Sequence, residues 1–299
     1  MQIAMRGLSA LLMIAMPLLL GAYLVRRYRT GWRLFLVGCA TFIGSQVLHL
    51  PFNAYILNPA LTSLGFTEAT KPGLALAAAA ILLGLSAGIF EEGARWLAYR
   101  FWIRTARTWP QGVVFGSGHG GAEAIIAGLL ALATLIQLTA LRGQDLTAVV
   151  PAEQLAVAQA QVEAYWATPW WLTLAPALER ASALAVQITL AVIVLQAFLR
   201  PRGGLWLLAA IGWHALIDAV AVFAGITTGV YSGSVSGIVI TEGIVLGLAL
   251  VSLVILFRLK ADEVPVPAAP PAPPPHTGPV GGGSDAGADL DASRYSPKG

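Results

Sequence analysis

Several ionisable side chains lie inside long apolar stretches of this sequence, where a charge is costly and usually serves a function. Within a bilayer such residues mark catalytic sites, ion pathways or buried ion pairs. Those that could do chemistry are Glu91, Glu92 and Arg95 in the third stretch, His119 and Glu123 in the fourth, Glu179 and Arg180 in the fifth, His214 and Asp218 in the sixth, and Glu242 in the seventh.

Three of these residues stand at matching distances from the arginines that flank their stretches. Glu91 precedes an arginine of the flanking loop by nine residues, and His119 and His214 each follow one by twelve. At a rise of about 1.5 Å per residue, all three lie roughly 13–18 Å in from the arginines. This agreement in depth predicts that a carboxylate and two imidazoles converge in one polar cavity, open toward the arginine-bearing side.

The spacing within each stretch predicts which side chains share a helix face. His119 and Glu123 are four residues apart, as are His214 and Asp218, so each pair lies on one face of a helix.

The third stretch adds a possible division of roles. Arg95 is four residues after Glu91 and three after Glu92, so it can pair with either. Adjacent residues point about 100° apart around a helix, so one glutamate can face a catalytic water while the other holds Arg95.

Glycines surround the first histidine, in the segment Gly116-Ser117-Gly118-His119-Gly120-Gly121. Such a segment allows close backbone approach, and small residues let membrane helices pack tightly. We expect a neighbouring helix or a substrate backbone to lie against His119.

Two hydrolytic chemistries fit this set of residues. In one, a glutamate acts as general base with His119, while His214 and Asp218 stabilise an oxyanion. In the other, His119, His214 and Glu91 bind Zn²⁺, which lowers the pKa of its bound water. The sequence is compatible with both, so the cofactor is either zinc or none. A serine mechanism through Ser117 would leave Glu91 and Arg95 without a role.

Other polar residues are expected to be structural. Glu179 and Arg180 lie nearer the opposite end of their stretch, as does Glu242, and we interpret them as supporting ion pairs. Gln46 and His49 lie beside Pro51, which favours a helix kink with polar packing over a ligand role.

Composition predicts the elements that position these residues. Hydrophobic residues make up 57% of the 299 and charged residues 11%, whereas soluble domains carry about 25% charged residues. This excludes a soluble enzyme, and no basic face indicates nucleic-acid binding. We predict an all-α, multi-pass membrane helix bundle embedded in a lipid bilayer. Its seven spans are expected at about residues 8–25, 34–57, 73–99, 111–141, 170–199, 204–229 and 237–257.

The cations between the spans predict the orientation. Eleven Lys and Arg residues fall in loops on one side and three on the other, so the N-terminus is expected outside and the C-terminus in the cytoplasm. The outside loop 142–168 is predicted to hold an interfacial helix. The transmembrane domain covers residues 1–260, and the Pro- and Gly-rich residues 261–299 are predicted to be a disordered cytoplasmic tail.

The motifs around Glu91-Glu92, His119 and His214 resemble the YhfC family of intramembrane proteases over about residues 5–258. More distantly they resemble the CAAX prenyl protease and PrsW superfamily, with Phe115 and His119 in a Phe-x-x-x-His motif. Two departures stand out. Arg95 follows Glu91 by four residues, where the CAAX pattern has five, and Gln187 stands where a family histidine is expected.

The resemblance implies an endopeptidase in a bacterial plasma membrane, acting on a membrane protein or peptide. Glu91 would be the base with His119, and His214 and Asp218 would bind the oxyanion. Because the family has been described as both metal-dependent and glutamic-type, the resemblance leaves both mechanisms open. The rival interpretations are a transporter or proton relay, and an inactive membrane scaffold.

Overall fold

The computed structural model describes residues 1–66, 73–148 and 150–261, and their regular structure is helical throughout. The long helices are α1 (Gln2–Tyr28), α2 (Trp32–Phe52), α4 (Leu74–Leu97), α5 (Trp109–Ala140), α7 (Ala175–Leu199), α8 (Gly203–Thr227) and α9 (Val235–Ala261). The shorter helices are α3 (Asn58–Ser63) and α6 (Leu155–Ala167), with π-helical turns at Asn53–Leu57 and Ala98–Trp102 and 3₁₀ turns at Leu146–Ala148, Ala152–Gln154, Trp170–Leu174 and Val230–Ser232. The predicted tail, 261–299, lies outside the described residues except for Ala261.

Seven helical segments of the described residues are long and apolar enough to cross a membrane, which confirms the predicted all-α bundle. They are Gln2–Tyr28, Trp32–Ser63, Leu74–Trp102, Trp109–Ala140, Trp170–Leu199, Gly203–Thr227 and Val235–Lys260. Each overlaps its predicted span. The second, third and fifth are longer than one α-helix because π or 3₁₀ turns extend them.

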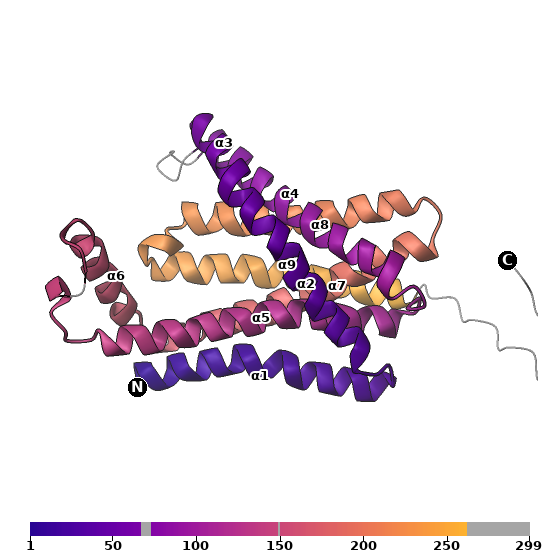
Figure 1. Ribbon diagram of the computed structural model, residues 1–299, viewed down its shortest axis with the longest axis horizontal. Helices are drawn as coiled ribbons and strands as arrows, with labels where there is room; N and C mark the ends of the chain where they lie inside the picture. Colours follow the sequence, from indigo (N-terminus) through magenta and orange to yellow (C-terminus); the bar gives the residue numbers. More distant parts are fainter. Residues whose placement is uncertain (67–72, 149, 262–299) are drawn as a thin grey trace, which may run out of the picture. The chain divides into compact units, whose positions relative to one another are not determined.

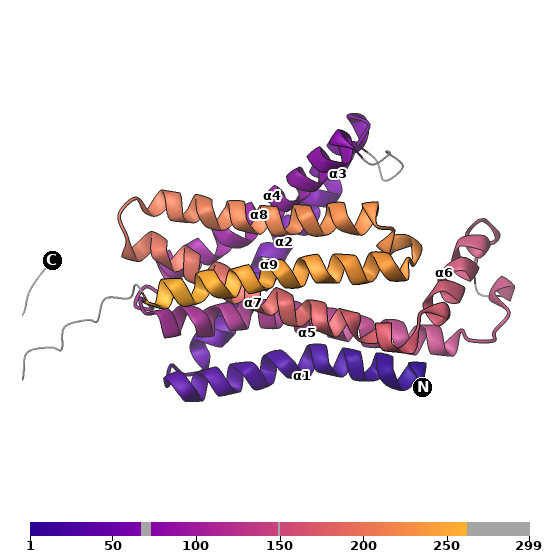
Figure 2. The same cartoon turned by 180° about the vertical axis from the view of Figure 1, so that it is seen from behind.

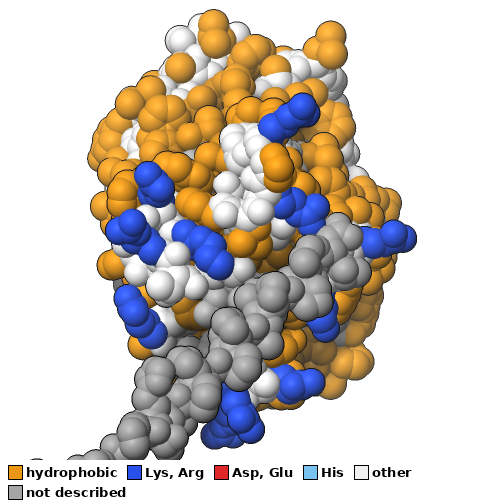
Figure 3. Space-filling model, turned by 90° about the vertical axis from the view of Figure 1, so that its right-hand side faces the viewer, with side chains coloured by type: hydrophobic (Ala, Val, Ile, Leu, Met, Phe, Trp, Pro, Cys, Tyr) orange, Lys and Arg blue, Asp and Glu red, His pale blue; other side chains and the backbone are white. Residues whose placement is uncertain are grey.

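Basic residues gather at one end of the spans. The last turns of α1 and α9 and the π turn after α4 carry arginines or lysine. Figure 3 looks onto this end and shows Lys and Arg side chains around it. We call it the basic end. Which end faces the cytoplasm stays a prediction from the cation asymmetry.

Helix α7 forms the centre of the bundle. In its most apolar stretch 72% of the residues are buried, against 11% for α9 at the periphery. It packs against α1, α5, α8 and α9. In Figures 1 and 2, α2 and α4 run obliquely across the other long helices. They pack against each other, while α2 also contacts α5 and α4 contacts α8.

The glycine-rich segment of α5 allows the close approach that the sequence predicts. A Cβ atom on Gly118 would collide with the backbone carbonyl of Phe35 in α2, and one on Gly120 would lie 2.7 Å from the Cβ of Gln187 in α7. Helices therefore pack against both of these glycines, which flank His119 in the sequence.

Local sequence explains how two of the site helices are shaped. Helix α5 begins after Thr108, whose side chain forms a reciprocal capping box with Gln111. Helix α2 contains Pro51 and passes directly into the π-helical turn Asn53–Leu57. Proline removes one backbone hydrogen bond, and π turns often occur where the helical ladder is interrupted. The turn gives Asn53 its place in the polar network described below.

Helix α6 lies within the predicted outside loop 142–168 and confirms that this loop is partly helical. The start of α1 binds the end of this segment. Gln2 donates to the carbonyls of Trp166 (2.9 Å) and Thr168 (2.8 Å), and Arg6 donates to the carbonyl of Tyr165. These bonds fix the loop to the end of α1 opposite the basic end. Its position at a membrane interface stays a prediction.

Candidate active site

Five buried residues from three helices form the centre of the polar network: Glu91, Glu92 and Arg95 from α4, His119 from α5 and His214 from α8. We call them the inner cluster. His119 Nε2 lies 3.1 Å from Glu91 Oε2, and His214 Nδ1 lies 2.7 Å from Glu92 Oε1. Each imidazole, predicted to lie at the depth of the glutamates, therefore contacts a different one of them.

The two adjacent glutamates have different surroundings. Arg95 donates to Glu92 and lies 3.7 Å from Glu91. The side chain of Glu92 is 0% exposed, whereas that of Glu91 is 8% exposed. Glu92 thus holds the arginine and His214, while Glu91 holds His119 and keeps some access. The pairing of Arg95 with one of the two glutamates was predicted from the spacing. That the other glutamate faces a catalytic water stays a prediction.

The surroundings of His119 indicate where its protons lie. The hydroxyl of Thr41 is 2.7 Å from the carbonyl of Gly38 and 3.3 Å from His119 Nδ1. A hydroxyl has one proton, and the shorter contact takes it, so His119 Nδ1 must donate to Thr41. With Nδ1 protonated, the contact between Nε2 and Glu91 needs one more proton, carried by either partner. Glu91 and His119 therefore share one transferable proton.

His214 faces two carboxylates. Its Nδ1 bonds Glu92, and its Nε2 lies 3.5 Å from Asp218 Oδ2, which is an ion-pair contact longer than a short hydrogen bond. The side chain of Asp218 is 39% exposed. The Nε2 atom of His214 thus points toward the accessible side of the inner cluster, where an incoming carbonyl oxygen could accept from it.

A second group of charges lies toward the end of the bundle opposite the basic end. Arg180 donates to Glu123 and to Glu179, at 2.5 Å in each case. We call these three residues the outer cluster. Glu123 shares a helix with His119 but pairs with Arg180 across helices. The carboxylate of Glu242 in α9 lies within electrostatic range of Glu179 and Arg180.

Two glutamines that sequence reasoning set aside lie at the centre of the network. The carbonyl of Gln187 accepts from Arg95, and its amide donates to Glu123 (2.7 Å) and Glu91 (3.3 Å). Gln46 donates to the other oxygen of Glu91 at 2.9 Å. Their distance from the flanking arginines could have indicated both, because Gln46 lies thirteen residues after Arg33 and Gln187 lies thirteen before Arg200.

The predicted opening toward the basic end is not supported by the packing of the described residues. In that direction α5 is buried without interruption from Gly112 through His119, and α7 is buried from Gln187 to Gln196. Tyr99 and Phe115, both fully buried and 4.9 Å apart between ring centroids, fill the space. The accessible charged side chains near the inner cluster, such as Asp218, lie in the other direction.

The donor atoms do not match a zinc site in this arrangement. Both nitrogens of His119 and the Nδ1 atom of His214 already contact a hydroxyl or a carboxylate, and the fixed charge of Arg95 contacts both glutamates. Across the described residues, no group of three or more His, Cys, Asp or Glu side chains could hold a metal ion. The predicted ligand set His119, His214 and Glu91 is therefore not among groups that could hold a metal ion in the described residues.

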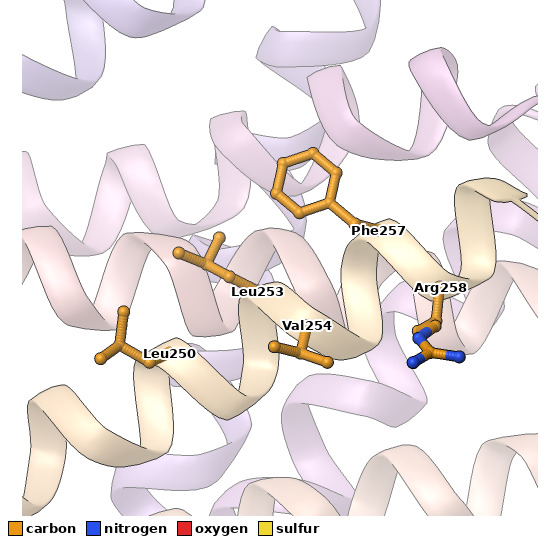
Figure 4. Close-up of a pocket in the computed structure, with 5 residues that line it drawn as sticks. All are labelled: Leu250, Leu253, Val254, Phe257 and Arg258. Carbon is orange, nitrogen blue, oxygen red and sulfur yellow. The ribbon is translucent and has the colours of Figure 1, made fainter.

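A surface hollow of about 500 Å³ lies elsewhere, along α9 near the basic end (Figure 4). It is lined by Leu250, Leu253, Val254, Phe257 and Arg258. Its lining is apolar apart from one arginine, so it offers no group that could activate water.

Comparison with known proteins identifies the family of the chain. Residues 12–245 match the family described as YhfC intramembrane metalloprotease. The chain is also similar to a Bacillus subtilis (strain 168) protein named "Uncharacterized membrane protein YhfC", with 32% identity over 220 residues that cover 72% of this chain and 82% of the relative. No solved structure matches. This multi-pass protein of a bacterial cell membrane thus belongs to the YhfC family, as its motifs predicted.

Proposed function

We propose that the protein is an intramembrane endopeptidase in which Glu91, assisted by His119, activates a water molecule. The observation that carries this proposal is the contact of 3.1 Å between Glu91 and His119 from different helices. Arg95 and His214 both contact Oε1 of Glu92, whose side chain is fully enclosed. The side chain of Glu91 is 8% exposed, so Glu91 is the glutamate that an incoming water can reach. The family description supports proteolysis, and the mechanism is our inference from the contacts.

In the first step Glu91 takes a proton from water, and the resulting hydroxide attacks the carbonyl carbon of the scissile peptide bond. The carbonyl π bond breaks and its electrons form an oxyanion. The tetrahedral intermediate then collapses, the C–N bond breaks, and the Glu91–His119 pair returns the proton to the leaving nitrogen. The products are a carboxylic acid and an amine. Positioned general acid–base groups contribute about 10²–10⁴-fold to such reactions.

The oxyanion needs donors placed where its charge develops, and His214 is the residue we assign to it. Glu92 fixes the ring through Nδ1, which leaves Nε2 facing the accessible side with Asp218 beside it. Loss of one such donor typically costs about 10²–10³-fold in rate. Asp218 has a supporting role, because its contact with the ring is long and its side chain is partly exposed.

The substrate class follows from the location of the site. The inner cluster lies within membrane-spanning helices, so the substrate must bring a peptide bond into or beside the bilayer. We propose a membrane protein or membrane-bound peptide as partner. In the supporting network, Arg95 neutralises Glu92, while Glu123, Glu179 and Arg180 form the adjoining outer cluster.

The proposal is tested with the purified protein in liposomes and a panel of membrane-spanning peptides. Mass spectrometry in ¹⁸O-labelled water should detect fragments whose new carboxylate carries one ¹⁸O, and Glu91→Gln should form them about 10²–10⁴-fold more slowly. Metal analysis of the same sample, with hydrolysis measured in chelator, separates the two hydrolytic mechanisms. Proton flux without cleavage would instead identify a relay, and neither activity would identify a scaffold.

A further inference from the structure

A chain of hydrogen bonds, in which each residue donates to the next, ends on Glu91. Ser86 donates to Asn53 Oδ1 (2.7 Å), and Asn53 Nδ2 lies 3.0 Å from His49 Nε2. His49 Nδ1 lies 3.4 Å from Gln46 Oε1, and Gln46 Nε2 donates to Glu91 Oε1 (2.9 Å). A single assignment of amide orientations and of the His49 tautomer satisfies all four contacts, with each residue donating to the next.

The second oxygen of Glu91 is held from another helix. Gln187 in α7 donates to Glu91 Oε2 and to Glu123 Oε2. Its amide cannot flip, because its carbonyl oxygen faces Arg95, and a guanidinium can only donate. The amide nitrogen of Gln187 must therefore face the two carboxylates.

We propose that Gln46 and Gln187 are positioning residues that hold the carboxylate of Glu91 in one orientation for attack on water. This inference rests on the proposed function. The two amides reach different oxygens of Glu91 from α2 and α7, so rotation of the carboxylate would break a bond to at least one of them. Both donors are neutral, so they orient the base without adding a second positive charge beside Arg95.

The hydrogen bonds from Ser86 through Asn53 and His49 end on Gln46 and fix the orientation of its side chain. Chains of hydrogen bonds in a low-dielectric interior polarise one another, and a fully satisfied chain makes a buried site rigid. The π-helical turn after Pro51 contains Asn53 and contributes it to this chain. The polar residues beside Pro51 thus act on Glu91 and are more than local packing around a kink.

Kinetics can separate positioning from simple filling of a polar interior. Gln46→Leu and Gln187→Leu should each lower kcat by about tenfold to a hundredfold, as expected for a misplaced reacting group. KM should change by less than about twofold, because neither residue is proposed to touch the substrate. In a Glu91→Gln background neither substitution should lower the residual rate further. The matched control is Gln196→Leu, a buried glutamine of α7 that bonds the Val192 carbonyl and Arg200.

An infrared measurement gives a readout that does not depend on turnover. The carboxylate band that Glu91→Gln removes from the spectrum should shift in Gln46→Leu and Gln187→Leu, and it should stay in place in Gln196→Leu. An unshifted band together with an unchanged kcat in folded variants would overturn the proposal. If the wild-type protein cleaves no peptide, the proposed function fails, and the band position alone decides whether the glutamines hold Glu91.

Discussion

The inner and outer clusters are built from the same charged groups but differ in burial and in their partners. Each joins carboxylates to one arginine, Arg95 in the inner cluster and Arg180 in the outer. Arg95 and Glu92 are completely buried, while Glu179 is 41% exposed. The inner cluster also contains the imidazoles of His119 and His214. The inner cluster thus contains imidazoles suited to proton transfer, whereas the ion pairs of the outer cluster consist of two carboxylates and a guanidinium.

This difference predicts different energetic roles. A buried ion pair is weak evidence of stabilisation, but removal of one partner leaves a stranded charge and costs several kcal/mol. Partly exposed pairs contribute about 1 kcal/mol or less, because solvent screens them. Substitution in the inner cluster should therefore affect turnover or folding strongly. Substitution in the outer cluster should have small effects on both.

The largest expected effect is on hydrolysis by Glu91→Gln. The amide keeps the shape of the carboxylate but cannot accept the proton of water, so kcat should fall by about 10²–10⁴-fold. Cleavage of a verified membrane peptide by the purified variant measures this, with insertion and thermal unfolding as folding controls. If Glu92→Gln abolishes cleavage and Glu91→Gln leaves it unchanged, Glu92 is the base and our assignment of roles is reversed.

Arg95→Ala should have the largest effect on folding. It leaves Glu92 buried beside His214 without its guanidinium partner, so the free energy of unfolding should fall by about 3–5 kcal/mol. The matched variant in the outer cluster is Arg180→Ala, for which a smaller loss is expected because Arg180 and its partners are only partly buried. Denaturant unfolding in mixed micelles measures both. Equal losses would show that burial does not separate the two clusters.

Substitutions at His214 and Asp218 are expected to have intermediate effects. His214→Ala removes the proposed oxyanion donor and should lower kcat by about 10²–10³-fold. Asp218→Asn keeps the size of the side chain beside Nε2 and should cost less than about tenfold, since the contact is already long and partly solvated. Rates measured on one peptide substrate compare the two. A larger loss for Asp218→Asn would make the carboxylate itself essential.

Sequence reasoning predicted the convergence of the inner cluster because helix rise is constant. Residues at equal depth on different helices must lie at one level, and the contacts of Glu91 with His119 and of Glu92 with His214 agree with this. It also predicted the seven spans, since their length and apolar composition follow directly from the thickness of the bilayer.

What the sequence did not reveal depends on packing between helices. Spacing within one helix places Glu123 on the face of His119, yet its observed partners, Arg180 and Gln187, come from α7. Gln46 was interpreted as polar packing beside Pro51, and Gln187 was named only as a departure from an expected family histidine. The sequence also did not predict from which side water or substrate reaches the inner cluster. That side depends on how Tyr99 and Phe115 fill the space toward the basic end.

Glu179→Gln is expected to have the smallest effect and tests the comparison most directly. Glu179 is the most exposed member of the outer cluster, and Arg180 keeps its bond to Glu123 when Glu179 is neutralised. Solvent already screens this pair, so the free energy of unfolding should change by less than about 1 kcal/mol. No bond links Glu179 directly to Gln187 or the inner cluster among the described contacts, so kcat should stay within about twofold of wild type. Denaturant unfolding and peptide cleavage on one preparation measure both. A fall in kcat without loss of stability would show that the outer cluster acts on the reaction, because a supporting ion pair would lower stability first.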